Sequence, residues 1–113
     1  MRKFSIDAVA RQQLKAAQES AASRAAVAVV GGHEQALRHT VLALLAGSKL
    51  AEHDNPGEAT LFVLSGRVTL AAEGEEWDAR SGDLVEIPSA RHEVRAEEDS
   101  TLLLTTVPRS RSS

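Results

Sequence analysis

From residue 25 to residue 107 the chain alternates between short runs of branched apolar residues and clusters of turn-forming residues. Glycine, proline, asparagine and serine bound nearly every run, and such residues interrupt regular structure. Short strands at regular intervals, separated by turns of this kind, are typical of a β-sandwich or β-barrel. We therefore expect strands at residues 25–30, 37–45, 60–64, 67–72, 84–87 and 101–107.

Two of these runs also predict which side chains are buried. Residues 67–70 alternate strictly between polar and apolar, so Val68 and Leu70 should face the core while Arg67 and Thr69 face solvent. Residues 61–64 are all apolar. That strand should be covered on both faces, by the barrel interior on one side and by a helix or a second subunit on the other.

The amino-terminal segment has a different composition. Residues 5–22 contain no glycine or proline and are rich in good helix formers, with Ser5 or Asp7 available as an N-cap. Their thin apolar stripe suits a helix that lies on a larger surface or on a partner chain. We expect a helical arm at residues 1–24, a β-barrel domain at residues 25–107 and a disordered tail at residues 108–113.

Composition excludes several classes of protein. A chain of 113 residues fits one domain, and the absence of cysteine excludes disulfides, thiolate metal sites and cysteine nucleophiles. The net charge of −3, with acids and bases interspersed, gives no electrostatic footprint for nucleic acid. The sequence has no apolar run near the roughly 18 residues that span a bilayer and no apolar core of a signal peptide. We expect a cytoplasmic protein with neither nucleic-acid nor membrane partners.

Two blocks of sequence carry the most specific spacing. The first runs from Gly47 through His53 to Gly66, and the second from Gly82 through Pro88 to His92. Their spacing resembles the two signature motifs of the cupins over residues from about 37 to 107. This resemblance implies an all-β cupin jelly-roll β-barrel preceded by an N-terminal α-helix. Small cupins are typically dimers, so it also implies a homodimer.

In the cupin family these motifs hold a metal through three histidines and a glutamate. Laid on this sequence, the histidine positions fall on His53, Asn55 and His92, and the glutamate position falls on Ala59. An amide oxygen is a weak ligand for transition metals and a methyl group is no ligand. The resemblance therefore implies a pocket at His53, Asn55 and His92, and we expect no tightly bound metal in it.

The alternative is a rearranged metal site. Glu58 lies next to the expected glutamate position, but strand alternation should turn its side chain to the opposite face unless a bulge near Pro56 and Gly57 reverses it. His39 lies on the strand before the first motif. With Glu58 or His39 as a further ligand, His53 and His92 would bind Zn, Mn, Fe or Ni.

Three hypotheses for function follow. The first is a non-catalytic barrel that binds a small molecule weakly at His53 and His92. The second is a dioxygenase-like or isomerase-like metalloenzyme, and the third is a structural dimer module tied to a regulatory partner. Among the other candidates, Trp77 reads as a half-buried strand residue that closes a sheet, and residues 73–76 read as a solvated turn. Arg91 reads as an anion ligand or an outward ion pair.

Overall fold

The computed structural model describes residues 1–32, 34–53, 57–88 and 91–108, the side chains of residues 51–53 excepted. The predicted all-β jelly roll with an N-terminal helix is confirmed. The elements, in chain order, are α1 (Ile6–Gln18), β1 (Arg24–Val30), β2 (Arg38–Leu44), β3 (Lys49–His53), β4 (Gly57–Ser65), β5 (Arg67–Ala72), β6 (Glu75–Arg80), β7 (Leu84–Ile87), β8 (His92–Ala96) and β9 (Ser100–Pro108).

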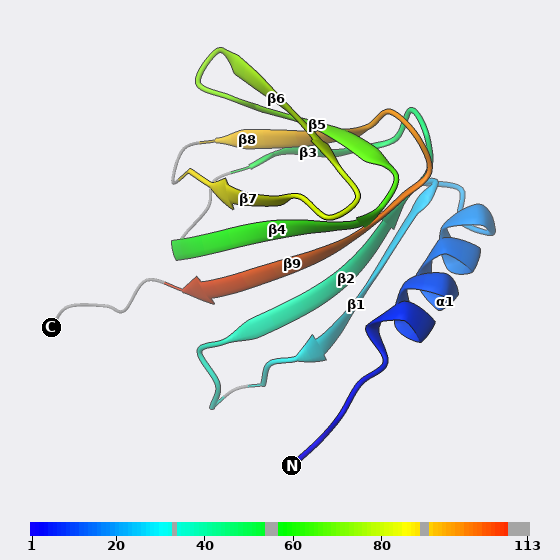
Figure 1. Ribbon diagram of the computed structural model, residues 1–113, viewed down its shortest axis with the longest axis vertical. Coiled ribbons are helices and arrows are strands. Elements are labelled where there is room, and N and C mark those ends of the chain that lie inside the picture. Colours follow the sequence, from blue (N-terminus) through cyan, green and yellow to red (C-terminus); the bar gives the residue numbers. More distant parts are fainter. Residues whose placement is uncertain (33, 54–56, 89–90, 109–113) are drawn as a thin grey trace, which may run out of the picture.

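The strands form two antiparallel sheets that face each other across the core (Figure 1). The five-stranded sheet has the order β1-β2-β9-β4-β7, and the four-stranded sheet has the order β3-β8-β5-β6. The links β2–β3, β4–β5, β6–β7 and β8–β9 all cross between the sheets at one end, on the right of Figure 1. We call this the closed end. At the opposite end, the open end, the edge strands β6 and β7 separate.

The inner faces of both sheets carry the core, as strand alternation requires. Val68 and Leu70 are buried there, and Arg67 and Thr69 lie half-buried on the outer face of β5. The buried aliphatic cluster between the sheets has as its largest members Leu42, Leu44, Leu61, Val63, Val68, Leu70, Ile87, Val94 and Leu102.

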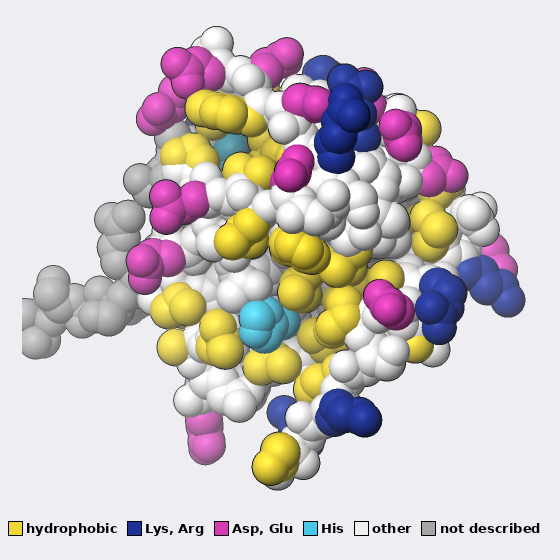
Figure 2. Space-filling model, viewed as in Figure 1, with side chains coloured by type: hydrophobic (Ala, Val, Ile, Leu, Met, Phe, Trp, Pro, Cys, Tyr) yellow, Lys and Arg dark blue, Asp and Glu magenta, His cyan; other side chains and the backbone are white. Residues whose placement is uncertain are grey.

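The outer face of the five-stranded sheet carries α1. The Ser5 side chain caps the helix by accepting a hydrogen bond from the Ala8 amide (3.3 Å), and Ala10 and Ala17 are its buried residues. The helix packs chiefly on β1 and β2. On the same face of β4, Phe62 and Leu64 remain half-buried. Hydrophobic side chains accordingly cross the middle of this side of the molecule (Figure 2).

Three strands were not predicted from the sequence: β3, β6 and β8. Each mixes charged and apolar residues, and β6 has only Trp77 and Ala79 as apolar members. Their outer faces point to solvent and bear ion pairs such as Arg67–Asp78 and Arg95–Glu97. In the described residues no helix is long and apolar enough to cross a membrane. The homodimer and the cytoplasmic location stay predictions.

Candidate functional site

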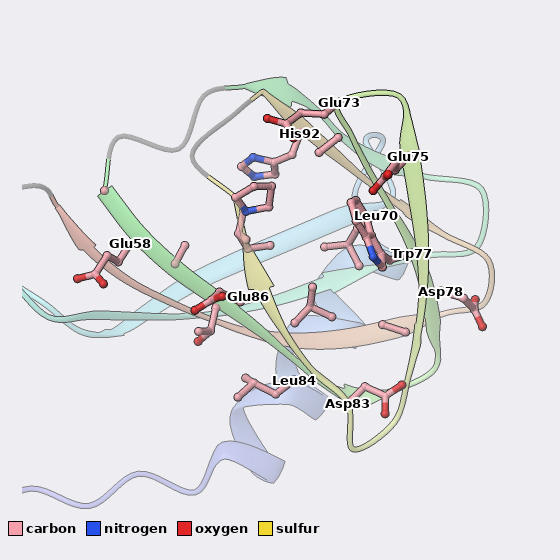
Figure 3. A pocket seen from close by; sticks show the side chains of 18 residues that line it. Glu58, Leu70, Glu73, Glu75, Trp77, Asp78, Asp83, Leu84, Glu86 and His92 are labelled. Carbon is pink, nitrogen blue, oxygen red and sulfur yellow. The ribbon is translucent and has the colours of Figure 1, made fainter.

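A cavity of about 870 Å³ lies between the two sheets at the open end (Figure 3). This volume falls within the range of small-molecule sites in proteins. Residues of β4, β5, β6 and β7 line it, together with His92 at the start of β8. Most of its floor comes from inner faces, and the outward residues Glu58 and Asp78 border its rim. Of the three residues predicted to share a pocket, His92 is the one whose side chain the structure describes, and it belongs to this lining.

Small side chains on the inner faces create the space. Ala59 on β4, Ala72 on β5 and Ala79 on β6 contribute only methyl groups to the lining, and Gly57 contributes none. Leu70, Val85 and Ile87 complete an apolar floor. A methyl group in place of a larger side chain leaves volume that the rigid sheets do not collapse to fill. The cavity is thus a consequence of residue size at the open end.

His92 is the buried polar residue of the lining, with 6% of its surface exposed. It shares the inner face of β8 with Val94 and Ala96. Its backbone pairs with Ala72 on one side and His53 on the other. Figure 3 shows its ring directed into the space between the sheets. An imidazole has two ring nitrogens that can take part in hydrogen bonds, and ligand sites typically place a few such polar groups in an apolar cavity.

His53 and Asn55 were predicted to share this pocket. The backbone of His53 ends β3 directly opposite His92, which places the two motif histidines at adjacent positions in one sheet. The side chain of His53 and the whole of Asn55 lie outside the described residues. Their part in the pocket stays a prediction.

Glu58 borders the same cavity as His92, but its side chain does not face the histidine. The register of β4 against β9 is continuous at Gly57, Glu58 and Ala59, so no bulge reverses the alternation there. Ala59 is buried on the inner face and Glu58 is exposed on the outer face, as alternation predicts. In Figure 3 the Glu58 side chain points away from the cavity.

His39 lies even farther from the site. On β2 it shares the outer face with Val41 and Ala43, opposite to the inward Leu42 and Leu44. Its Nδ1 atom is 3.0 Å from the hydroxyl of Thr105 on β9. The five-stranded sheet therefore stands between His39 and the cavity.

These positions decide how well the described side chains fit a metal. Where the family places a carboxylate, Ala59 offers no donor atom. Within the described ranges, no three His, Asp or Glu side chains are grouped closely enough to hold an ion. A site with open positions for chemistry needs about three protein ligands. The described donor set does not fit such a centre.

Among the cavity residues that sequence reasoning missed are Glu75 and Trp77. The turn at Glu73 and Gly74, where both φ angles are positive (54° and 78°), joins β5 to β6 as a two-residue hairpin. This turn sets Ala72 opposite Glu75 and Leu70 opposite Trp77.

Directly paired residues share a face of the sheet. Because Leu70 and Ala72 face inward, Glu75 and Trp77 face inward as well. The prediction that residues 73–76 form a solvated turn is therefore wrong for Glu75 and Glu76, which begin β6. The signal that would have found them is the hairpin register and not the composition of the segment.

The pairing also places the histidine and a carboxylate at the two ends of one row of residues across three strands. His92, Ala72 and Glu75 are successive backbone partners across β8, β5 and β6, and all three face inward. We call these three residues the His92 row. Adjacent strands are about 4.8 Å apart, so the Cα atoms of His92 and Glu75 are separated by roughly 10 Å.

The carboxylates around the cavity differ in their partners. On the outer face of β6, Asp78 accepts a hydrogen bond from Arg67 Nε (2.8 Å), and this bond lowers the pKa of the Asp78 carboxyl group. Asp83 accepts from the backbone amide of Arg80 (2.8 Å). Among the described residues, no cation lies within ion-pair distance of Glu73, Glu75 or Glu86.

Basic residues are absent from the described part of the lining, which contains neither lysine nor arginine. Arg91 is exposed and does not contribute to it. The site therefore combines an apolar floor, one buried imidazole, an indole and carboxylates near the mouth. The lining is therefore apolar at its floor and acidic near its mouth.

Comparison with known sequences supports the fold assignment. The sequence profile described as "Cupin domain" matches residues 40–108, more than half of the chain. No curated protein matches the sequence significantly.

Solved structures with the same fold are numerous. A conserved protein of unknown function from Streptococcus pyogenes has 22% identity and a TM-score of 0.74, covering 97% of this chain and 90% of its own. A cupin superfamily protein from Desulfitobacterium hafniense has 14% identity and a TM-score of 0.70, and the match covers 76% of this chain and 78% of that protein. A salicylate 1,2-dioxygenase variant from Pseudoaminobacter salicylatoxidans has 23% identity and a TM-score of 0.76, covering 94% of this chain but 34% of the enzyme.

Proposed function

The chain belongs to the cupin domain family, and from that membership we propose that it is a small-molecule-binding cupin whose ligand occupies the cavity at the open end. In this proposal His92 forms a hydrogen bond to the ligand from inside the cavity. His53 and Asn55 complete the pocket beside it. The apolar floor holds the rest of the ligand.

The observation that carries the proposal is a buried imidazole in a cavity whose other inner-face lining is largely aliphatic. His92 is 6% exposed, while Ala59, Ala72, Ala79 and Ile87 surround the same space. Hydrophobic pockets with a few well-placed polar groups are typical of ligand sites. Larger side chains at the alanine positions would fill this volume and pack the core more tightly. Stability of the core therefore does not account for the cavity.

The proposal involves no metal step, because the described donor set does not fit a metal centre. Ala59 stands where the family has a carboxylate, Glu58 points outward, and His39 lies on the far side of a sheet. The dioxygenase resemblance is one of fold at 23% identity, and by itself it assigns no reaction to this chain.

Binding is tested by screening mixtures of small molecules with saturation-transfer NMR. We compare the wild type with Ala72→Leu, which fills the cavity, and with Ala16→Leu, a matched change at an exposed helix position. The proposal predicts ligands that bind the wild type and Ala16→Leu and lose affinity for Ala72→Leu. It fails if no molecule binds, or if binding is indifferent to Ala72→Leu.

The metalloenzyme alternative is tested by elemental analysis of protein purified without added metal. The same measurement is made on His53→Ala and His92→Ala. Our proposal predicts far less than one metal ion per chain in the wild type. Near-stoichiometric metal in the wild type that is lost in both variants would contradict the proposal and support the metalloenzyme hypothesis.

A further inference from the structure

We propose that the cavity selects amphipathic organic cations, meaning an ammonium group attached to an apolar body. This inference rests on the proposed function, because it concerns the ligand of the same cavity. It commits to the charge of the ligand, which the family assignment leaves open.

The first argument is the pairing of a carboxylate with an indole on one strand. Glu75 and Trp77 are alternate residues of β6, so both point to the inner face with their Cα atoms about 7 Å apart. Trp77 is 44% exposed at the mouth of the cavity. An ammonium group is attracted both to the face of an indole ring and to a carboxylate. Two neighbouring groups thus favour the same charge.

The second argument is the charge of the lining as a whole. The described lining contains carboxylates and no lysine or arginine. Asp and Glu side chains are prominent at the upper left of Figure 2, near the β5–β6 hairpin of Figure 1, and along the left margin, near the open-end parts of β7 and β4. A cleft lined by one sign of charge raises the local concentration of ligands of the opposite sign. An anionic ligand would meet an unfavourable potential here.

The third argument compares the two faces of β6. On the outer face, Glu76 and Asp78 have arginine partners at 3.9 Å (Arg95) and 2.8 Å (Arg67). On the inner face, Glu75 has no ion pair with any residue in the described part of the chain. Of the three carboxylates on β6, the one without an ion pair is therefore the one directed to the cavity, where a ligand can approach it.

The fourth argument concerns the depth of the cavity. Its floor is apolar at Leu70, Ala72 and Ile87, whereas Glu75 and Trp77 lie near solvent. Burying an ammonium group completely would cost much of its hydration free energy, so the head group stays at the mouth. The apolar body of the ligand then extends over the floor toward His92.

The test is isothermal titration calorimetry of the full chain at low ionic strength and neutral pH. The probes are phenethylamine, phenethyl alcohol and hydrocinnamate, which share an apolar body and differ in charge. We expect the amine to bind about tenfold more tightly than the alcohol, with hydrocinnamate weakest.

Two variants then locate the charge effect. Glu75→Gln should weaken binding of the amine roughly three- to tenfold and leave binding of the alcohol unchanged. Glu76→Gln is the matched control, because it removes the same charge from the opposite face of the same strand. It should leave both affinities unchanged, and thermal unfolding shows whether each variant is folded.

The outcomes separate this inference from the proposed function. If the alcohol or hydrocinnamate binds as tightly as the amine, or if Glu76→Gln acts as strongly as Glu75→Gln, cation selectivity is wrong and the cavity remains a ligand site. If none of the probes binds while the screen yields a neutral or anionic ligand sensitive to Ala72→Leu, the inference alone fails. If no ligand of any charge binds, both proposals fail.

Discussion

Strand β4 passes through both ends of the barrel, and its inward residues differ sharply between them. Toward the closed end Leu61 and Val63 are completely enclosed, with at most 1% of their surface exposed. Toward the open end Gly57 and Ala59 leave space that becomes the cavity. The same backbone geometry therefore supports tight packing at one end and a hollow at the other, and only side-chain size separates the two.

Polar groups follow the same division. At the closed end the fully buried Ser100 accepts a hydrogen bond from the Arg67 amide (3.0 Å) and donates to the carbonyl of Glu98 (2.7 Å). These bonds join β5 to the turn before β9. At the open end Glu75 lies on the inner face without an ion pair in the described residues. Ser100 at the closed end thus serves the fold, whereas our proposal assigns Glu75 at the open end to a ligand.

The largest expected effect is at the closed end, from Gly66→Ala. Gly66 has φ +89°, and an added Cβ would overlap Ser100 and the carbonyl oxygen of Asp99. The left-handed conformation alone costs roughly 1 to 3 kcal/mol for a residue with a side chain, before the overlap with backbone is counted. Urea unfolding should show a loss above that range, or no folded protein.

The matched control for Gly66 is at the open end. Gly74 has φ +78°, but an added Cβ there would meet nothing within 4 Å. Gly74→Ala should therefore show the conformational cost alone. Equal destabilisation by the two substitutions would contradict the account of the closed end as tightly packed.

A second comparison enlarges one alanine at each end. Ala96→Leu inserts volume into the packed core on β8 and should destabilise the protein by about 1 to 3 kcal/mol. Ala72→Leu inserts the same volume into the cavity and should change the free energy of unfolding by less than about 0.5 kcal/mol. Chemical denaturation measures both. A loss for Ala72→Leu as large as that for Ala96→Leu would mean that the open end has no usable space.

The third prediction removes a hydrogen-bonding side chain from the closed end. Ser100→Ala leaves the Arg67 amide without its acceptor in a partly buried position, at a cost of about 1 to 2 kcal/mol. Ser81→Ala removes an exposed hydroxyl that donates to the Leu64 carbonyl (2.9 Å), and water can replace that bond. Denaturation midpoints should fall clearly for the first variant and barely for the second; the reverse order would contradict this assignment.

The smallest expected effect lies on the solvent side of the four-stranded sheet. Arg67 lowers the folded-state pKa of Asp78, so this stabilisation is complete above the unfolded carboxyl pKa of about 3.9 and is lost as pH falls through the lower folded value. Asp78→Asn should slightly reduce stability at neutral pH and flatten its decline in acid. Thermal unfolding across this pH range measures the difference, which should shrink in high salt. A difference that grows as pH falls would contradict the assignment.

The sequence predicts the fold better than it predicts the site. The turn glycines, the apolar runs and the motif spacing identify the barrel, and the alternation rule correctly turns Glu58 outward. These features are local. The position of His39 on the outer face depends on which side of β2 the helix covers, and that is decided by packing between distant segments.

The residues of β6 that face the cavity could not be predicted from the sequence for a related reason. Glu75 and Glu76 are identical in type, and nothing in their own segment says which one faces inward. The choice is made by their partners Ala72 and Ala71, through a hairpin turn that lacks the usual Asn-Gly or Asp-Gly signal. When a strand carries charged residues on both faces, the register of the neighbouring strand is needed to tell which of them face inward.

The most direct test of the account is a methyl NMR titration with whichever of phenethylamine and phenethyl alcohol binds more tightly. We predict saturable chemical-shift changes that are largest at the methyl groups of Ala72, Ala79 and Ile87, which line the cavity, and small at Leu44 and Ala96 in the closed core. If shifts do not saturate, or are largest on the outer face of the five-stranded sheet, the open end is not the ligand site.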